Sequence, residues 1–116
     1  MSDLYVSGMA IAPNVVETIV TMAIRDVEGV AALVSDATGG IRSLLPGGKA
    51  STQGVEVGVD ENEKLRVGVH IEVDSGHVLP DIAANVRKAI ADAIAMQVGI
   101  EIGSVDVYVD GIRFSK

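Results

Sequence analysis

The sequence predicts an α+β fold, a two-layer sandwich in which two amphipathic helices cover one face of a mainly antiparallel sheet. The first observation is that valine and related side chains occupy alternate positions from 55 to 59, from 65 to 73 and from 105 to 109, the spacing of half-buried strands. The second is that apolar residues recur every three or four positions from 15 to 27 and from 82 to 94, the spacing of helices with one buried side. The expected order is strand, helix, strand, loop, strand, strand, helix, strand.

Length and composition limit what the chain can be. With 116 residues it can bury one core, so we expect residues 1–116 to form a single domain. The formal net charge of −7, without a basic cluster, argues against nucleic acids and anionic lipid surfaces as partners. The lack of cysteine excludes disulfides and thiol nucleophiles and is compatible with a reducing interior. No signal-peptide pattern and no apolar run of roughly 20 residues is present, so we predict no direct membrane insertion.

The first third of the chain is predicted to contain a strand, a helix and a short second strand. Leu4 to Ile11 reads as the first strand, and Gly8 within it suggests a bulge or a close backbone contact. Pro13 suits the start of a helix, and Gly29 ends the apolar helical pattern. Val30 to Val34 is the candidate second strand.

Residues 35–53 show no periodicity and are rich in glycine and serine, so we predict a flexible surface loop. A connection of this length in a small domain is often functional. Two interpretations stay open: a loop whose Ile41, Leu44 and Leu45 tuck onto the body of the domain, or a loop that binds a partner.

The stretch from Gly54 to Asp74 is predicted to form a hairpin around which the sheet is built. Residues that face each other across a strand pair must point the same way, so odd positions oppose odd positions and residues 60–64 become the connection. One face of the hairpin is then a valine surface that the helices can cover. The other face carries mainly polar side chains: Glu56, Arg66, His70, Glu72 and Asp74.

The last third of the chain is predicted to contain a helix and a strand. Pro80 begins the helix, which runs to about Val98, and its apolar stripe suits a position on the sheet. Gly99 ends it. The final strand is expected over Val105 to Asp110, where valine alternates with polar residues.

His70, Glu72 and Asp74 share the polar face of one predicted strand, and His77 follows closely in sequence. Imidazole and carboxylate groups at alternate strand positions could present ligands to a metal ion. Solvated side chains on the wet face of a sheet explain the same pattern. We therefore predict no metal and no cofactor, and keep these four residues only as candidates.

No catalytic residues are predicted. The serines lie in no nucleophile-elbow pattern, and only two histidines could act as bases. The acidic residues Asp60, Glu61 and Glu63 do not have the spacing of a calcium-binding EF-hand loop. The glycine clusters of the predicted loop do not have the context of a phosphate-binding loop. We expect a protein that is not an enzyme.

Gly58 and Gly68 are expected to be near neighbours across the hairpin, where they could leave a shallow groove beside His70. Glycine-interrupted strand faces and exposed sheet edges can pair with another chain. The predicted interaction surface is therefore Gly58, Gly68 and His70, with Ile41, Leu44 and Leu45 of the loop as a further region. The alternative is that the glycines only permit twist of the strands.

Several segments occur in a recognisable order along nearly the whole chain, from about Tyr5 to Phe114. They are Gly8 to Val16, Val27-Glu28-Gly29-Val30, Gly54 to Val57, Val67 to Val73, the helix from Ile82, and Val105 to Ile112. In this order and spacing they resemble the alkaline shock protein family of cell-envelope stress proteins. The chain departs from the family pattern at Ala12, where serine or threonine is usual, and at Ser75-Gly76, where an aromatic residue usually precedes the glycine.

The resemblance implies a small bacterial cytoplasmic protein without known catalysis that is linked to cell-envelope homeostasis. It also implies a homo-oligomer, a membrane-anchored envelope protein as partner, or both, and a place at the inner membrane face through that partner. We therefore expect a non-enzymatic scaffold or adaptor that acts through protein contacts. The alternative is a small-ligand or metal-binding accessory protein that uses the polar sheet face.

Overall fold

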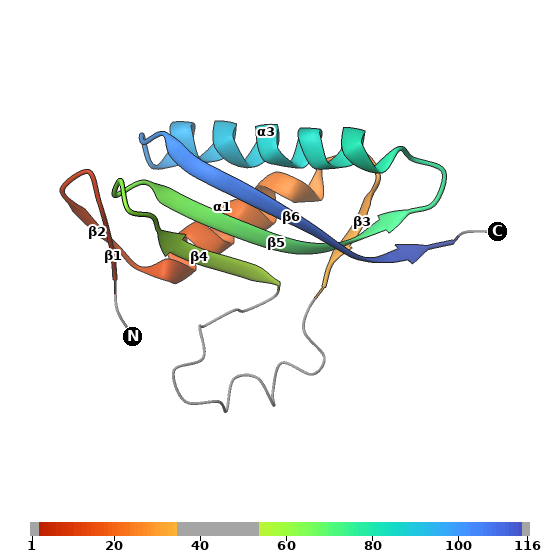
Figure 1. Ribbon diagram of the computed structural model, residues 1–116, viewed down its shortest axis with the longest axis horizontal. Helices are drawn as coiled ribbons and strands as arrows, with labels where there is room; N and C mark the ends of the chain where they lie inside the picture. The colour runs from red at the N-terminus through yellow and green to blue at the C-terminus, as the bar shows by residue number, and fades with distance from the viewer. Residues whose placement is uncertain (1–2, 35–53, 115–116) are drawn as a thin grey trace, which may run out of the picture.

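The computed structural model describes residues 3–34 and 54–114, which form the predicted two-layer α+β sandwich (Figure 1). The elements in chain order are β1 (Leu4–Val6), β2 (Met9–Ile11), α1 (Pro13–Arg25), β3 (Val30–Leu33), β4 (Val55–Val59), β5 (Leu65–Asp74), α3 (Leu79–Gln97) and β6 (Ile102–Arg113). The predicted loop at 35–53, with Ile41, Leu44 and Leu45, lies outside the described residues.

The single N-terminal strand expected from Leu4 to Ile11 is in fact a small hairpin. Strand β1 pairs antiparallel with β2, and Val6 lies opposite Met9. The two residues between them, Ser7 and Gly8, have φ angles of 51° and 78°. A two-residue turn with positive φ at both positions matches the right-handed twist of the flanking strands. Gly8 therefore belongs to a turn and does not mark a bulge within one strand.

Strand β5 is the centre of the main sheet. Strands β3 and β4 both run antiparallel to β5, whereas β6 runs parallel to it. The predicted hairpin register is confirmed, because odd residues oppose odd residues, with Val55 opposite Val69 and Val59 opposite Leu65. The parallel direction of β6 follows from α3, which carries the chain back along the sheet before β6 begins. Strand β6 also starts earlier than predicted, at Ile102.

Strands β3 and β4 follow each other in line beside β5, although residues 35–53 separate them in sequence. At their junction the N–H of Val34 donates to the carbonyl oxygen of His70 over 2.8 Å, and the N–H of His70 donates to the carbonyl oxygen of Gly54 over 2.9 Å. Gly54 has a φ of 78°, and a Cβ at this position would lie 2.4 Å from the carbonyl oxygen of Val34. The chain thus leaves the sheet and rejoins it at the same place.

Both helices lie on the same face of the sheet (Figure 1). The odd-numbered side chains of β5 are fully buried beneath them. Each helix contributes an apolar stripe to this core: Val16, Val20 and Ile24 from α1, and Ile82, Val86, Ile90 and Ile94 from α3. No described element covers the other face of the sheet, so the even-numbered side of β5 is open.

Candidate functional site

The open face of the sheet gathers polar side chains from three adjacent strands. Strand β4 supplies Glu56, β5 supplies Arg66 and His70, and β6 supplies Asp106 and Tyr108. Alternation places these residues on one side, because every second side chain of a strand points to the same face. The predicted polar face is therefore present, and β6 widens it.

His70 stands at the centre of this face and bonds to both neighbouring strands. Its Nε2 lies 2.9 Å from Oε2 of Glu56, and its Nδ1 lies 2.9 Å from Oδ2 of Asp110. Its ring stacks on that of Tyr108, with ring centroids 4.5 Å apart and an angle of 13° between the planes. One imidazole thus joins β4, β5 and β6 on the open face.

The two carboxylates favour the charged form of His70. Burial of the ring, the largest single influence, lowers the pKa of His70, but the hydrogen bonds and charges of Glu56 and Asp110 together raise the pKa above its ordinary value of 6.5. Hydrogen bonding explains why the pKa of His70 is raised. A carboxylate oxygen can only accept a hydrogen bond, and both ring nitrogens can donate at once only in the imidazolium form.

Asp110 reaches His70 because β6 contains one extra residue at this point. Val109 pairs with Ile71, and Gly111 pairs with the next residue, Glu72, so Asp110 has no partner of its own in the ladder. Such a β-bulge re-aims a side chain locally. It gives His70 a second carboxylate partner, and the pairing with β5 resumes directly afterwards at Gly111.

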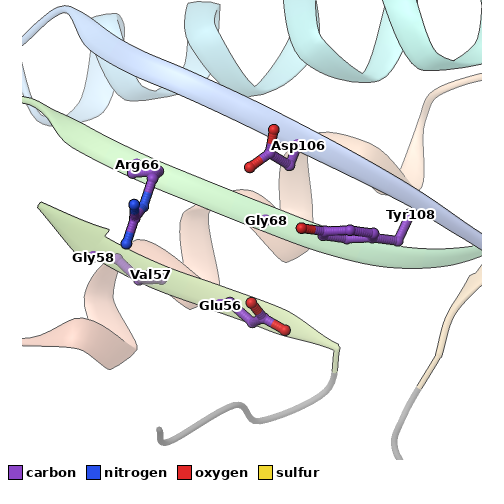
Figure 2. Close-up of a pocket in the computed structure, with 7 residues that line it drawn as sticks. All are labelled: Glu56, Val57, Gly58, Arg66, Gly68, Asp106 and Tyr108. Atoms are coloured by element: carbon purple, nitrogen blue, oxygen red, sulfur yellow. The ribbon is translucent and has the colours of Figure 1, made fainter. Parts of the chain in front are cut away.

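Beside this cluster the open face is hollowed to a volume of about 240 Å³. Its lining consists of Glu56, Val57, Gly58, Arg66, Gly68, Asp106 and Tyr108 (Figure 2). Gly68 leaves the space, because a Cβ there would lie 3.5 Å from Cε2 of Tyr108 and 3.7 Å from Oε1 of Glu56. Figure 2 shows Arg66 reaching from β5 toward Gly58 on β4, with Asp106 on β6 at the opposite side.

Three polar groups of the hollow are free to bind a partner. Within residues 3–34 and 54–114, the Arg66 guanidinium, the Asp106 carboxylate and the Tyr108 hydroxyl make no hydrogen bond or ion pair. Glu56, in contrast, is held by His70. Among the described residues, the hollow therefore presents one free cationic group and one free anionic group across a floor of glycine.

The four residues considered as metal ligands do not converge. His70 is held between Glu56 and Asp110, whereas Glu72 accepts a hydrogen bond of 2.7 Å from Nη2 of Arg113. His77 lies exposed in the turn that leads to α3. In the described part of the chain, no group of three or more histidine or carboxylate side chains is placed to hold a metal ion.

The contribution of β6 to the site was not predicted from the sequence. Asp106, Tyr108 and Asp110 were assigned to the last strand, but their position beside His70 depends on the parallel pairing of β6 with β5. A signal for the bulge exists in the sequence. The apolar alternation of β6 steps by two up to Val109 and then by three to Ile112, which is the pattern that one extra residue produces.

Comparison with protein families matches residues 5–114 to the alkaline shock protein 23 family, the family of alkaline shock protein-like proteins, which has a cell envelope-related function. The chain belongs to the alkaline shock protein family. The match covers the segments on which the resemblance to this family rested, and it confirms that resemblance.

Three bacterial relatives resemble this member of the alkaline shock protein family. The uncharacterized protein Spy1535 of Streptococcus pyogenes is 25% identical over 116 residues, which cover 100% of this chain and 87% of the relative. The uncharacterized protein YqhY of Bacillus subtilis is 28% identical over 113 residues, or 97% of this chain and 82% of the relative. The uncharacterized protein YloU of Bacillus subtilis is 28% identical over 65 residues, or 56% of this chain and 53% of the relative.

No solved structure matches the chain. Among the described helices, none is long and apolar enough to cross a membrane.

Proposed function

We propose that this alkaline shock family protein is a non-enzymatic scaffold or adaptor in cell-envelope homeostasis, and that it acts through protein contacts. The family assignment supports the envelope role. The observation that carries the proposal is the open face of the sheet, on which His70, Glu56, Asp110 and Tyr108 hold one another in a fixed arrangement. A preordered and solvent-accessible face of this kind suits recognition, because little side-chain entropy is lost when a partner binds.

The chemistry of His70 supports a role other than catalysis. A histidine base activates a nucleophile when one ring nitrogen contacts a hydroxyl or thiol group. Here both ring nitrogens contact carboxylate oxygens. The raised pKa also favours the protonated ring, which cannot accept a proton. The contacts of His70 therefore serve the arrangement of the strands.

The size of the hollow supports a side chain of a partner protein as its occupant. Pockets for small molecules commonly span about 300–1,000 Å³, whereas this hollow measures about 240 Å³. Its walls carry the free groups of Arg66 and Asp106. We propose as partners further copies of the chain, a membrane-anchored envelope protein, or both, with the protein in the cytoplasm at the inner membrane face.

Recovery of partners from native membranes tests this function. The tagged protein is compared with the variant Asp106→Arg, which reverses the charge of the hollow, and with Asp92→Arg, which makes the same change on the exposed side of α3. We expect the parent and Asp92→Arg to recover envelope proteins and Asp106→Arg to lose them. Recovery of no membrane or envelope protein by the parent would contradict the scaffold role. A small molecule that copurifies with the parent but not with Asp106→Arg would favour the ligand-binding alternative.

A further inference from the structure

We infer that the free edge of β6 is a strand-addition site for an extended segment of a partner protein in which apolar and basic residues alternate. This inference rests on the proposed function, since it names the surface and the chemistry of a partner for a protein that acts through contacts. It concerns the main chain around Val107 and Val109, next to the hollow and separate from it.

One edge of β6 is paired and the other is open. Strand β5 lies along the paired edge through most of the length of β6. No described strand lies along the other edge (Figure 1). An unpaired edge presents a row of N–H and C=O groups that can form a ladder with another strand.

A side-chain contact shows which residues direct their main chain outward. The Nε–H of Arg87 on α3 donates to the carbonyl oxygen of Val105 over 3.4 Å, so this carbonyl is not directed at β5. The N–H and C=O groups of one residue point to the same edge, and the direction alternates along the strand. Val107 and Val109 therefore also direct their main-chain groups to the free edge. Beyond the bulge at Asp110 the alternation of main-chain directions is reversed, so the odd-numbered Arg113 directs its carbonyl toward β5. The N–H of Ser75, which directly follows β5, accordingly donates to the carbonyl oxygen of Arg113.

The helix side of this edge is apolar and exposed. Val109 and Ile112 pair with the buried residues Ile71 and Val73, which places their side chains on the helix face. They are nevertheless 37% and 47% exposed. A partner strand could cover them with its own apolar side chains and so extend the core layer.

The other side of the edge is acidic. Asp106 and Asp110 lie on the open face of β6 with Tyr108 between them, and the Asp106 carboxylate has no partner within the described ranges. The whole chain carries a formal net charge of −7. Basic side chains on alternate positions of a partner strand would face these carboxylates, and opposite charges across a strand pair are stabilising.

The same charges argue against a second copy as the occupant. Antiparallel pairing of two β6 edges would bring the Asp106 and Asp110 rows of two copies together on one face. Like charges opposite each other on a strand pair are destabilising. A partner of the opposite charge is the better fit.

Nuclear magnetic resonance of the full, isotope-labelled chain with synthetic peptides tests the inference. The probe is a short capped peptide of alternating lysine and valine. The first control has glutamate in place of lysine, and the second has the same side chains with N-methylated amides, which cannot form a ladder. We expect the lysine peptide alone to shift the amide signals of Val107 and Val109 and to slow their exchange with solvent at least about tenfold.

Two variants sharpen the result. Asp106→Lys should weaken binding of the lysine–valine peptide and allow binding of the glutamate–valine peptide, whereas Asp92→Lys on α3 should not change the preference. Arg87→Ala removes the donor that occupies the Val105 carbonyl, so it should strengthen binding of the lysine–valine peptide.

Several results would overturn the inference. Equal binding of the N-methylated peptide would show charge attraction without strand pairing. Protection of the Val107 and Val109 amides that rises with protein concentration, without peptide, would assign the edge to a second copy. No binding of the lysine–valine peptide, together with recovery of envelope proteins by the parent, would reject the edge site and leave the scaffold role intact.

Discussion

At the scale of single residues, His70 joins strands β4, β5 and β6 on the open face. Its folded-state pKa lies above the ordinary value of 6.5, so its bonds to Glu56 and Asp110 stabilise the fold fully below pH 6.5. This stabilisation is lost as the pH rises through the folded-state pKa. We expect His70→Gln to lower the free energy of unfolding by about 1–2 kcal/mol between about pH 5 and pH 6.5, and the difference from the parent to shrink as pH rises, as measured by denaturant unfolding.

A matched control for this prediction is His77→Gln, which removes the exposed histidine and should show no such difference. Titration of the ring protons by nuclear magnetic resonance provides a direct measurement. A pKa of His70 at or below the ordinary value would contradict the prediction.

Two glycines allow a comparison within the same sheet. Gly54 has a positive φ, and its Cβ would lie 2.4 Å from the Val34 carbonyl oxygen, whereas a Cβ at Gly68 would meet its nearest atom at 3.5 Å. We expect Gly54→Ala to cost at least about 2 kcal/mol of unfolding free energy, and Gly68→Ala to change it by no more than about 1 kcal/mol. Equal costs in chemical denaturation would contradict this account.

The part of the site that could be predicted residue by residue is the part within the hairpin. Alternation correctly placed Glu56 and His70 on one face and put Gly58 and Gly68 near each other across the strands. The contacts of His70 with Asp110 and Tyr108 could not be predicted in this way. They depend on a neighbour that is distant in sequence and on a one-residue irregularity in its strand.

At the scale of elements, the in-line arrangement of β3 and β4 makes residues 35–53 separable from the sheet. Val34 and Gly54 both bond to the backbone of His70, so a short connection can join them. We expect a variant with residues 35–53 replaced by about four glycine and serine residues to fold, with stability raised by about 1 kcal/mol because the loop to be closed is shorter. Thermal unfolding and the amide spectrum of β5 provide the measurements.

Loss of the β5 amide signals in that variant would show that residues 35–53 contribute to the fold. If the fold remains but membrane partners are lost, the result would favour the interpretation of this segment as a partner-binding loop. A control linker of about 19 residues with the same composition separates the effect of length from that of sequence.

Periodicity predicted the main elements because each is long enough to repeat its pattern. Helices α1 and α3 and strand β5 all lie where the apolar spacing placed them. The β1–β2 hairpin was missed, because strands of three residues are too short to show that alternation restarts after Ser7 and Gly8. The parallel direction of β6 also leaves no trace in periodicity, since alternation is the same in either direction.

At the scale of the whole molecule, charge is distributed unevenly. The open face carries the acids Glu56, Glu72, Asp74, Asp106 and Asp110, and these are partly balanced by Arg66, Arg113 and His70. Most of the net charge of −7 therefore belongs to other surfaces. If copies meet through their open faces, as proposed, the repulsion to be overcome is long-ranged and is screened by salt.

We therefore expect the solution mass measured by light scattering to rise with protein concentration, and to rise further with added salt. Gly68→Arg, which fills the hollow, should lower the mass, whereas Asn85→Arg adds the same charge on the exposed side of α3 and should not. A constant monomer mass at every concentration and salt level would remove further copies of the chain from the proposed partners.

The bulge in β6 corresponds to a single residue, Asp110, and therefore to a single codon. Asp110 has no partner in the ladder, and Gly111, Ile112 and Arg113 resume the pairing with β5 directly after it. Deleting the single codon for Asp110 would therefore leave every other residue of β6 on its present face, and would make the pairing with β5 regular from Ser104 to Arg113. Only the second carboxylate of His70 would be lost. The regular stretch of open edge would become longer, and a longer regular edge pairs more readily with unintended strands. One extra residue in β6 thus has two effects: it forms a bond that joins neighbouring strands, and it limits the length of regular edge that the sheet exposes.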